Sequence, residues 1–348
     1  MTVVLRPADL GGDRERILGV LQKNLPGLPH SQRFEWLYCN NPAGQAWSWL
    51  AYDQQTEKPI GVASVFPRMV WLDRGVAKCG QVGDFAVESG YRSLGPALML
   101  QRATFEPVNK GLLAFCYDCP PHDQGMAPFR RLGMSANCSV ERYARLQKSR
   151  RELEKRIGNE KLARSLAPVV DFFLSWRSFP RPKCPGIEIS QFTGQFGEEF
   201  THLDEQARND GAVRNRRDAQ TLNWRFLQDP LNTYRLLTAR RSGELVGYAA
   251  VALRGEDAFI VDLFALNVSE VGPELLHAVT EIIKAEPIQA LYLLAGDRSG
   301  MASILRGNGF QFRSLLANIV VYARPSATTQ ELLEKSKNWF FVHADLQA

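Results

Sequence analysis

Residues 84–97 read Asp-Phe-Ala-Val-Glu-Ser-Gly-Tyr-Arg-Ser-Leu-Gly-Pro-Ala, and this stretch decides the fold. Its apolar start predicts a buried strand ending at Val87, its polar middle predicts a short turn, and its end opens a helix. Unpaired backbone N–H groups at a helix start attract anions, and the helix dipole adds positive potential. Small residues let the main chain approach a pyrophosphate closely, and Arg92 supplies a permanent cation. The stretch therefore predicts a diphosphate site between Arg92 and Ala97, where Pro96 is tolerated in the first helical turn.

The chain also contains a long internal repeat. Residues 34–42, Phe-Glu-Trp-Leu-Tyr-Cys-Asn-Asn-Pro, correspond to residues 222–230, Leu-Asn-Trp-Arg-Phe-Leu-Gln-Asp-Pro. Each copy continues into two β-like runs around a short polar turn, which is typical of a hairpin. Three further matches follow in the same order, and they pair residues 83–87 with 261–265, 94–98 with 271–275, and 130–134 with 306–310. Because all four lie roughly 180 residues apart, they predict two copies of one α/β domain.

The order of elements within each copy predicts the fold class. We expect an α/β protein (an α+β mixed sheet) with two tandem domains, each a mostly antiparallel sheet with a central parallel crossover flanked by helices. The expected strands include Val3–Arg6 and Ile187–Gln191 at the start of each copy, and Gly111–Tyr117 and Ala290–Leu294 after each crossover helix. The expected division is an N-terminal domain over 1–146, a basic helical linker over 147–186, a C-terminal domain over 187–330 and a tail over 331–348.

Composition excludes several classes of protein. With 348 residues, of which 45% are hydrophobic, the chain is long enough for two packed domains, and a net charge of +5 is too dilute to indicate a nucleic-acid-binding protein. No run of about 18 apolar residues predicts a transmembrane helix, and the first residues do not resemble a signal peptide. The six cysteines are expected to be reduced thiols, and no metal site is predicted. We therefore expect a cytoplasmic protein. The basic linker helix could rest on a membrane surface or on RNA, but an interdomain helix with a solvated face is favoured.

The segment Arg92-x-x-Gly-x-Ala after a strand ending in valine resembles the acetyl-CoA loop of the GNAT acyltransferase superfamily. The segment 127–134, which ends in Leu-Gly-Met, is similar to the last sequence block of that family. The whole chain looks like a tandem GNAT protein, and residues 34–51 with the closing Trp339-Phe340-Phe341 further resemble bacterial exopolysaccharide-associated GNAT-like proteins. The resemblance implies acyl transfer from acetyl-CoA or another acyl-CoA to a small amine, amino-sugar or hydroxyl acceptor. The residues that it assigns to cofactor binding are Phe85, Ala86, Val87, Arg92, Ser93, Leu94, Gly95, Pro96 and Ala97.

Direct attack on a thioester requires a neutral nucleophile, so a carboxylate near the end of the central strand is expected to accept the proton. Asp84 is the first candidate for this base and Glu88 the second. The structural alternative for Asp84 is a carboxylate that caps local backbone or pairs with Arg92. Phe129 stands where many members of the family have a tyrosine as general acid, and a phenylalanine cannot donate a proton. Because a thiol has a pKa of about 8.5, its thiolate can leave with little help.

The second copy departs from the pattern. The segment 267–272 offers no cation in place of Arg92 and adds Glu270, which would repel a pyrophosphate. We therefore expect the second copy to have lost CoA binding and to act as a packing partner or as a wall of the acceptor site. Trp36, Tyr38, Trp224 and Asp229 are candidates to line a cleft between the domains, with core packing as the alternative for the two tryptophans.

Two other functions remain open from the sequence. Phe129 and the degenerate second copy fit a non-catalytic interaction or acyl-CoA-sensing protein. The paired units and the basic linker fit a Fem-type aminoacyl transferase, although such proteins lack the CoA loop that is the clearest feature here. Nucleic acid is not an expected partner, and the oligomeric state cannot be derived.

Overall fold

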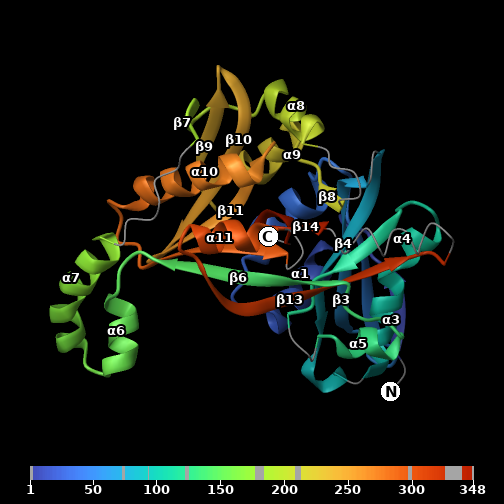
Figure 1. The fold of residues 1–348 in the computed structure, drawn as a ribbon. Helices are drawn as coiled ribbons and strands as arrows, with labels where there is room; N and C mark the ends of the chain where they lie inside the picture. The colour runs from blue at the N-terminus through green and yellow to red at the C-terminus, as the bar shows by residue number, and fades with distance from the viewer. Residues whose placement is uncertain are drawn as a thin grey trace.

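The computed structural model describes residues 3–72, 75–92, 94–121, 125–176, 184–207, 213–296, 300–325 and 339–346. One mixed sheet runs through all of it, in the strand order β1-β2-β3-β4-β5-β13-β6-β12-β11-β10-β9-β7 (Figure 1). The first half supplies β1 (Val3–Pro7), β2 (Trp47–Asp53), β3 (Pro59–Leu72), β4 (Gly75–Val87) and β5 (Phe115–Asp118). The second half supplies β7 (Ile187–Phe192), β9 (Tyr234–Arg241), β10 (Glu244–Arg254), β11 (Asp257–Ala265) and β12 (Ala290–Gly296). The predicted mixed α/β class is confirmed.

Each half contains the predicted parallel crossover. Strand β4 is parallel to β5, and β11 is parallel to β12, whereas the other pairs in each half are antiparallel. The strand predicted over residues 111–117 was placed too early, because only Phe115–Asp118 is extended. Gly111 has a φ of +75° and turns the chain after the preceding helix, so the residues before Phe115 form a turn. The strand predicted over residues 290–294 is confirmed and continues to Gly296.

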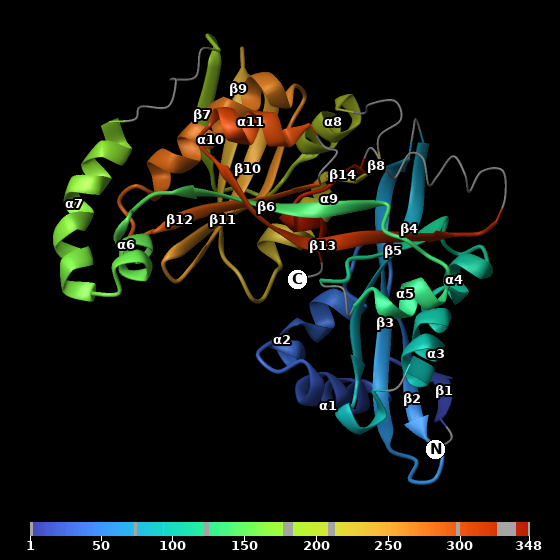
Figure 2. The ribbon, with the colours of Figure 1, turned by 60° about the horizontal axis from the view of Figure 1, so that its bottom comes forward.

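Two strands cross between the halves. Strand β6 (Cys138–Leu146) pairs with β12 of the second half, and β13 (Gln311–Ala323) pairs with β5 of the first half. The two also pair with each other, side by side across the middle of the molecule (Figure 2). Each half therefore completes its sheet with a strand from the other half, and the exchange leaves neither β5 nor β12 as an open edge. The sheet does not stop at the expected boundary after residue 146.

Helices cover both faces of the sheet. In the first half, α1 (Arg14–Asn24), α2 (His30–Phe34) and the π-helical turn η1 (Glu35–Cys39) pack on one face, and α3 (Leu94–Thr104), α4 (Glu106–Asn109) and α5 (Ala127–Arg131) lie on the other. In the second half, α8 (Glu198–Gln206), α9 (Ala219–Leu222) and the π-helical turn η3 (Asn223–Leu227) face α10 (Val268–Ile283) and α11 (Met301–Gly307) across the sheet. Apolar residues at helical spacing on α10, including Val271, Leu275 and Val279, are buried in the core of the second half.

The two π-helical turns meet between the halves. The ring of Trp36 stacks on that of Trp224 with centroids 4.7 Å apart. Trp36 Nε1 donates to the carbonyl oxygen of Trp224 at 2.9 Å, and Trp224 Nε1 donates to that of Trp36 at 3.1 Å. Both tryptophans are buried, so the core-packing alternative is confirmed for this pair.

The linker is helical, as predicted. Helices α6 (Arg150–Ile157) and α7 (Glu160–Trp176) pack on each other beside the second half (Figure 1). Arg151 holds them to the sheet through an ion pair with Asp257 at 2.7 Å. The proline-rich connector that was predicted after α7 lies mostly outside the described residues. Among the helices that the structure describes, none combines the length and the apolar character needed to span a bilayer.

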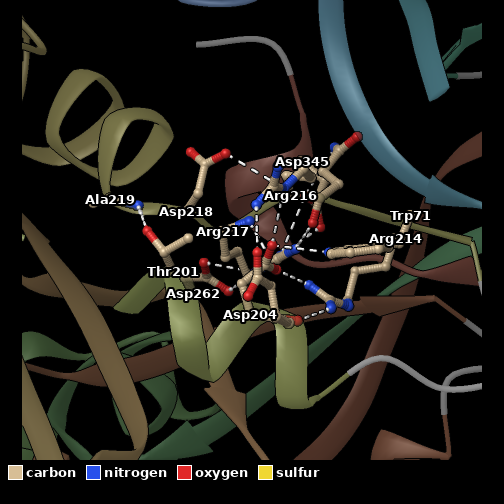
Figure 3. Close-up of polar contacts among 12 residues, drawn as sticks. Trp71, Thr201, Asp204, Arg214, Arg216, Arg217, Asp218, Ala219, Asp262 and Asp345 are labelled. Carbon is tan, nitrogen blue, oxygen red and sulfur yellow. Dashed lines mark hydrogen bonds and ion pairs between the residues drawn. The ribbon is translucent and has the colours of Figure 1, made fainter. Parts of the chain in front are cut away.

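The end of the chain lies between the halves. Strand β14 (Trp339–Phe340) pairs with β8 (Val213–Asn215), which in turn pairs with β3 of the first half. The 3-10 turn η4 (His343–Asp345) follows. Asp345 accepts hydrogen bonds from Arg217, and Arg217 also pairs with Asp262 on β11 at 3.1 Å (Figure 3). This buried network ties the C-terminal segment 339–346 to the second half.

Candidate functional site

The first half opens where β4 and β5 diverge. The two strands are paired only at Gly80 with Cys116 and at Gln81 with Tyr117. Beyond Gln81, β4 continues to Val87 with β3 on one side and no strand paired on the other among the described residues. A strand edge of this kind presents backbone N–H and C=O groups that an extended ligand with amide groups can pair with.

The predicted diphosphate site lies at the end of β4. A single 3-10 turn, Ser89–Tyr91, separates β4 from α3, which begins at Leu94. Arg92 is exposed, and its Nε donates to the carbonyl oxygen of Val87 at 3.1 Å. Gly95, Pro96 and Ala97 form the first turn of α3, as predicted, and the missing N–H of Pro96 breaks no helical bond there. Ser93, the remaining loop residue of the prediction, lies outside the described residues.

The strand residues assigned to the cofactor alternate between two faces. Ala86 is buried against the α1 side, and Val87 and Phe85 pack on the α3 side. Gly61 on β3 lies behind them, and a Cβ there would lie 3.0 Å from Leu100 of α3 and 3.1 Å from the carbonyl oxygen of Ala86. The glycine thus lets α3 sit close to the sheet, which brings its N-terminus to the end of β4.

Asp84 is buried and bound on both oxygens. It forms an ion pair with Arg33 of α2, and its Oδ2 accepts a hydrogen bond from the hydroxyl of Tyr38 at 2.6 Å. Burial raises the pKa of Tyr38 well above its usual value, so this hydroxyl remains a donor. Asp84 itself has a φ of +47°, a backbone conformation that only a few non-glycine residues adopt. The cation that pairs with Asp84 is thus Arg33, which sequence reasoning missed, in place of the suggested Arg92.

Glu88 is also buried and paired. Its Oε1 lies 2.9 Å from Nζ of Lys23 and 3.2 Å from Nζ of Lys58. Burial alone would raise the pKa of Glu88, but the hydrogen bonds and charges of the two lysines outweigh it and hold this pKa below its usual value. Glu88 is therefore ionised at neutral pH and has a weak affinity for a proton.

Asp118 is the titratable group at this site that sequence reasoning missed. It is the last residue of β5, one position after the Gln81–Tyr117 pair at which the two strands diverge. Burial raises the pKa of Asp118 to about 7, and the backbone N–H of Cys119 lowers it only in part. The one signal in the sequence is a carboxylate at the carboxyl end of the second parallel strand.

The aromatic side chains near the site are engaged in packing or in hydrogen bonds. Phe129 packs in a buried cluster with Phe105 and Met126. The hydroxyl of Tyr91 donates to Asp53 at 2.7 Å, and that of Tyr117 donates to the carbonyl oxygen of Asp345 at 3.2 Å. None of the six cysteines forms a disulfide, and the described residues contain no cluster of side chains that could bind a metal ion.

The matching region of the second half is built differently. Helix α10 begins at Val268, five residues before Pro273, whereas α3 begins two residues before Pro96. Helix α10 therefore has about one additional turn before its proline, and this turn carries Glu270. The carboxylate of Glu270 pairs with Arg241 at 2.6 Å and accepts a hydrogen bond from Cys184, and these two contacts lower its pKa.

The C-terminal segment 339–346 lies against β11 and β12 of the second half. The backbone N–H of Gly296, at the end of β12, donates to the carbonyl oxygen of Phe341 at 3.0 Å. The ring of Phe340 lies 6.0 Å from that of Phe264 on β11. Asp262, which corresponds to Asp84, is bound in a similar way, by Arg217 and by the hydroxyl of Tyr248 at 2.7 Å.

Comparison with known proteins supports the fold. A scan against models of protein families finds no match, and a search of curated proteins finds none either. Among solved structures, a probable N-acyltransferase from Enterococcus faecalis has a TM-score of 0.66 at 12% identity, covering 93% of this chain and 72% of that chain. A GCN5-related N-acetyltransferase from Anabaena variabilis has a TM-score of 0.62 at 12% identity, covering 92% and 72%. Eis1 from Mycobacterium abscessus has a TM-score of 0.56 at 13% identity, covering 92% and 73%. These similarities run through both halves, and the protein therefore has the fold of the GCN5-related N-acetyltransferases.

Proposed function

We propose that the protein is an acyl-CoA-dependent N- or O-acyltransferase that binds its cofactor in the first half only. The observation that carries the proposal is the difference between the two crossover helices. Helix α3 starts directly after the loop with Arg92 and small residues, while α10 starts a turn earlier and carries Glu270 already paired with Arg241. An anion is attracted to the first helix start, whereas at the second the carboxylate of Glu270 already lies in the first turn of the helix.

The proposed cofactor site has two parts. The diphosphate of acyl-CoA lies at the start of α3, against Arg92 and the backbone of Ser93, Leu94, Gly95 and Ala97, with Pro96 holding the turn. The pantetheine arm, which contains two amide groups, runs along the free edge of β4 and pairs with the backbone of Phe85, Ala86 and Val87. This arrangement directs the thioester toward the point where β4 and β5 diverge.

The reaction is direct transfer. The lone pair of a neutral amine or hydroxyl attacks the thioester carbon, a C–N or C–O bond forms, the C–S bond breaks and CoA leaves as a thiolate. A small amine or amino-sugar is the proposed acceptor. The proton released by the nucleophile needs an acceptor on the protein. Asp84 and Glu88 are candidates from the sequence, and both are held by cations, Arg33 for Asp84 and lysines for Glu88.

Asp118 fits the role of proton acceptor better than either of them. A general base works best when its pKa is near the working pH, and the pKa of Asp118 is about 7. Asp118 lies beside the point where β4 and β5 diverge. Asp84 is bound by an arginine and a tyrosine, as is Asp262 in the second half, which lacks the Arg92 loop. We therefore propose that Asp118 accepts the proton and that Asp84 holds Arg33 and Tyr38 in position.

The first test is cofactor binding. Calorimetric titration with acetyl-CoA should show one site per chain, and Arg92→Ala should weaken binding by roughly 10- to 100-fold, since a hydrogen bond to a charged group contributes about 1.5–3 kcal/mol. Arg313→Ala, an exposed arginine on β13, is the charge-matched control and should bind normally. A wild-type protein that does not bind acetyl-CoA contradicts the proposal.

The second test assigns the base. Release of CoA thiol should rise with pH through about 7, and Asp118→Asn should lower the rate by about 10²- to 10⁴-fold. Stability provides an independent check. From pH 3.8 to about 7 the folded state keeps a proton that the unfolded state has released, so stability should fall as pH rises through this range. Asp118→Asn should remove that slope. If Asp84→Asn or Glu88→Gln abolishes the rate while Asp118→Asn does not, Asp118 is not the base.

One observation favours a second candidate function. Phe129 is buried in a packed cluster where the resemblance would place a catalytic tyrosine, which fits a protein that binds acyl-CoA without turnover. Acetyl-CoA binding without thiol release, across a panel of amines, would favour this candidate. The proposed location is the cytoplasm, which fits six cysteines that form no disulfide, because thiols persist in reducing compartments. The resemblance to exopolysaccharide-associated proteins stays a prediction.

A further inference from the structure

Most buried arginines of this protein have a carboxylate partner. Arg33 pairs with Asp84, Arg214 with Asp204, and Arg217 with both Asp262 and Asp345 (Figure 3). Such pairing is the rule, because an ionised group taken out of water costs several kcal/mol unless an opposite charge compensates it. Among the buried arginines that the structure describes, Arg68 and Arg225 are the exceptions.

Arg225 lies in η3 of the second half and is 7% exposed. Its guanidinium stacks over the ring of Trp36 of the first half, 5.7 Å from the ring centre. Its Nε and Nη1 are buried and have no hydrogen-bond partner, and no ion pair with it is found within the described part of the chain. Trp36 stabilises the cation through its π face, but it accepts none of the donor hydrogens.

Arg68 lies in β3 of the first half and is 8% exposed. Its guanidinium lies over the ring of Trp224, 5.0 Å from the ring centre. It donates only to neutral groups, the side-chain oxygen of Gln81 at 3.1 Å and the carbonyl oxygen of Pro67 at 3.3 Å. Burial lowers its pKa, and repulsion from Arg225 lowers it further. Each arginine is thus held over a tryptophan of the opposite half.

The position of the two arginines connects them with the proposed reaction. Gln81, which binds Arg68, belongs to the last β4–β5 pair before these strands diverge. Asp345 is close enough to attract Arg68, but its carboxylate is bound by Arg217 and Asn215. On the side of Arg225, the nearby His343 has its pKa lowered to about 3, first by burial and then by Arg254 and Arg225. The two guanidinium groups therefore create a positive region beside the end of the proposed pantetheine path, and no carboxylate of the described segments is bound to either.

We propose that Arg68 and Arg225 bind an anionic group of the acceptor, a carboxylate or a phosphate, and so place its amine at the thioester. The planar guanidinium is suited to bind both oxygens of such a group at once. The anion supplies the missing partner for the buried charges, and because each half contributes one arginine, the site needs both. The inference rests on the proposed function for the identity of the ligand as an acyl acceptor, while anion binding itself is independent of that function.

Anion binding is tested first, without CoA. Inorganic phosphate should raise the thermal unfolding temperature of the wild type, because a ligand that binds only the folded state stabilises it. The increase should be lost in Arg225→Met and in Arg68→Met, which keep the side-chain volume over each tryptophan. Arg92→Ala should retain the phosphate-dependent increase in unfolding temperature, which distinguishes this site from the proposed cofactor site. Arg164→Met on α7 is the control for the loss of one positive charge. Should one arginine variant fail to fold, the other carries the same test. An equal increase in wild type and both variants overturns the proposal.

Acceptor choice is tested second, by release of CoA thiol from acetyl-CoA. Two pairs of amines differ only in the anion: ethanolamine and O-phosphoethanolamine for phosphate, alanine and alaninamide for carboxylate. The anionic member of one pair should have a KM roughly 10-fold or more below its neutral partner, and Arg225→Met should remove that preference. The pair that shows the preference identifies the anion. Turnover without preference for either anion overturns the inference and leaves the proposed function standing, whereas absence of acetyl-CoA binding contradicts the proposed function alone.

Discussion

The two halves share an order of strands and helices but differ at the start of the crossover helix. In the first half, α3 follows β4 after one short turn, and Arg92 lies exposed beside it. In the second half, α10 has an extra turn, Glu270 is bound by Arg241, and the C-terminal segment packs against β11 and β12. The two helix starts therefore differ by about one helical turn and by the Glu270–Arg241 ion pair, and our proposal is that only the first binds an anion. Under this proposal, a shared architecture keeps its core while one copy loses a binding site.

The largest expected effect concerns the buried ion pairs that correspond in the two halves. Arg217→Met should lower the free energy of unfolding by about 3–5 kcal/mol, because it leaves the carboxylates of Asp262 and Asp345 buried without a cation. Arg33→Met leaves only Asp84 without its ion pair and should cost less. Urea unfolding of both variants measures the difference, with Arg6→Met at an exposed ion pair as the control. Equal losses would show that the two pairs are equivalent.

Substitution of either tryptophan at the contact between the halves should lower the unfolding free energy by a similar amount. Trp36→Phe and Trp224→Phe each remove one indole donor and leave a buried carbonyl oxygen without its partner, which costs about 1–3 kcal/mol in unfolding free energy. Because the rings touch, the double variant should lose less than the sum of the single ones. Additive losses in urea unfolding would contradict coupling of the halves through this pair.

The two glycines behind the crossover helices give a finer comparison. A Cβ on Gly247 would lie 2.9 Å from both Ala265 Cβ and the carbonyl oxygen of Phe264. A Cβ on Gly61 would lie 3.0 Å from the flexible end of Leu100 and 3.1 Å from the carbonyl oxygen of Ala86, so its backbone contact is looser. Gly247→Ala should therefore destabilise the protein by about 1–2 kcal/mol and Gly61→Ala by less, as measured by thermal unfolding. The reverse order would show that α3 is packed more rigidly than α10.

The smallest expected effect tests whether charge alone separates the two helix starts. Glu270→Gln removes the repelling carboxylate but leaves the extra turn of α10 in place. Stability should hardly change, because the ion pair with Arg241 is partly exposed. Calorimetric titration with acetyl-CoA should still show one site per chain. A second site in this variant would mean that the charge, and not the extra turn, prevents binding.

Local patterns predicted much of this molecule. The spacing of apolar residues located β1, β7 and the strands that end near Val87 and Leu266, and the turn residues located the start of α3. The basic linker was correctly predicted as helical, since its apolar and polar residues alternate with the period of a helix. These predictions succeeded because backbone preference and the period of burial are properties of neighbouring residues.

Contacts between residues far apart in the chain could not be predicted from the sequence. The pairing of Asp84 with Arg33 joins residues 51 positions apart, and the strand predicted from residue 111 was shortened by a glycine turn that periodicity does not reveal. Asp118 is titratable near neutral pH only because β5 and its neighbours remove it from water, which its place in the sequence does not show.

By itself, the sequence determined the α/β class, the helix start with Arg92 and the absence of a matching cation in the second copy, since each of these depends on residues close in the chain. Only the tertiary structure decided that β6 and β13 cross between the halves, that residues 339–346 pack on the second half, and that Arg68 and Arg225 are buried with no carboxylate partner among the described residues. The physical reason is that strand pairing and burial depend on which distant surfaces meet, and many pairings satisfy the same local pattern of apolar and polar residues.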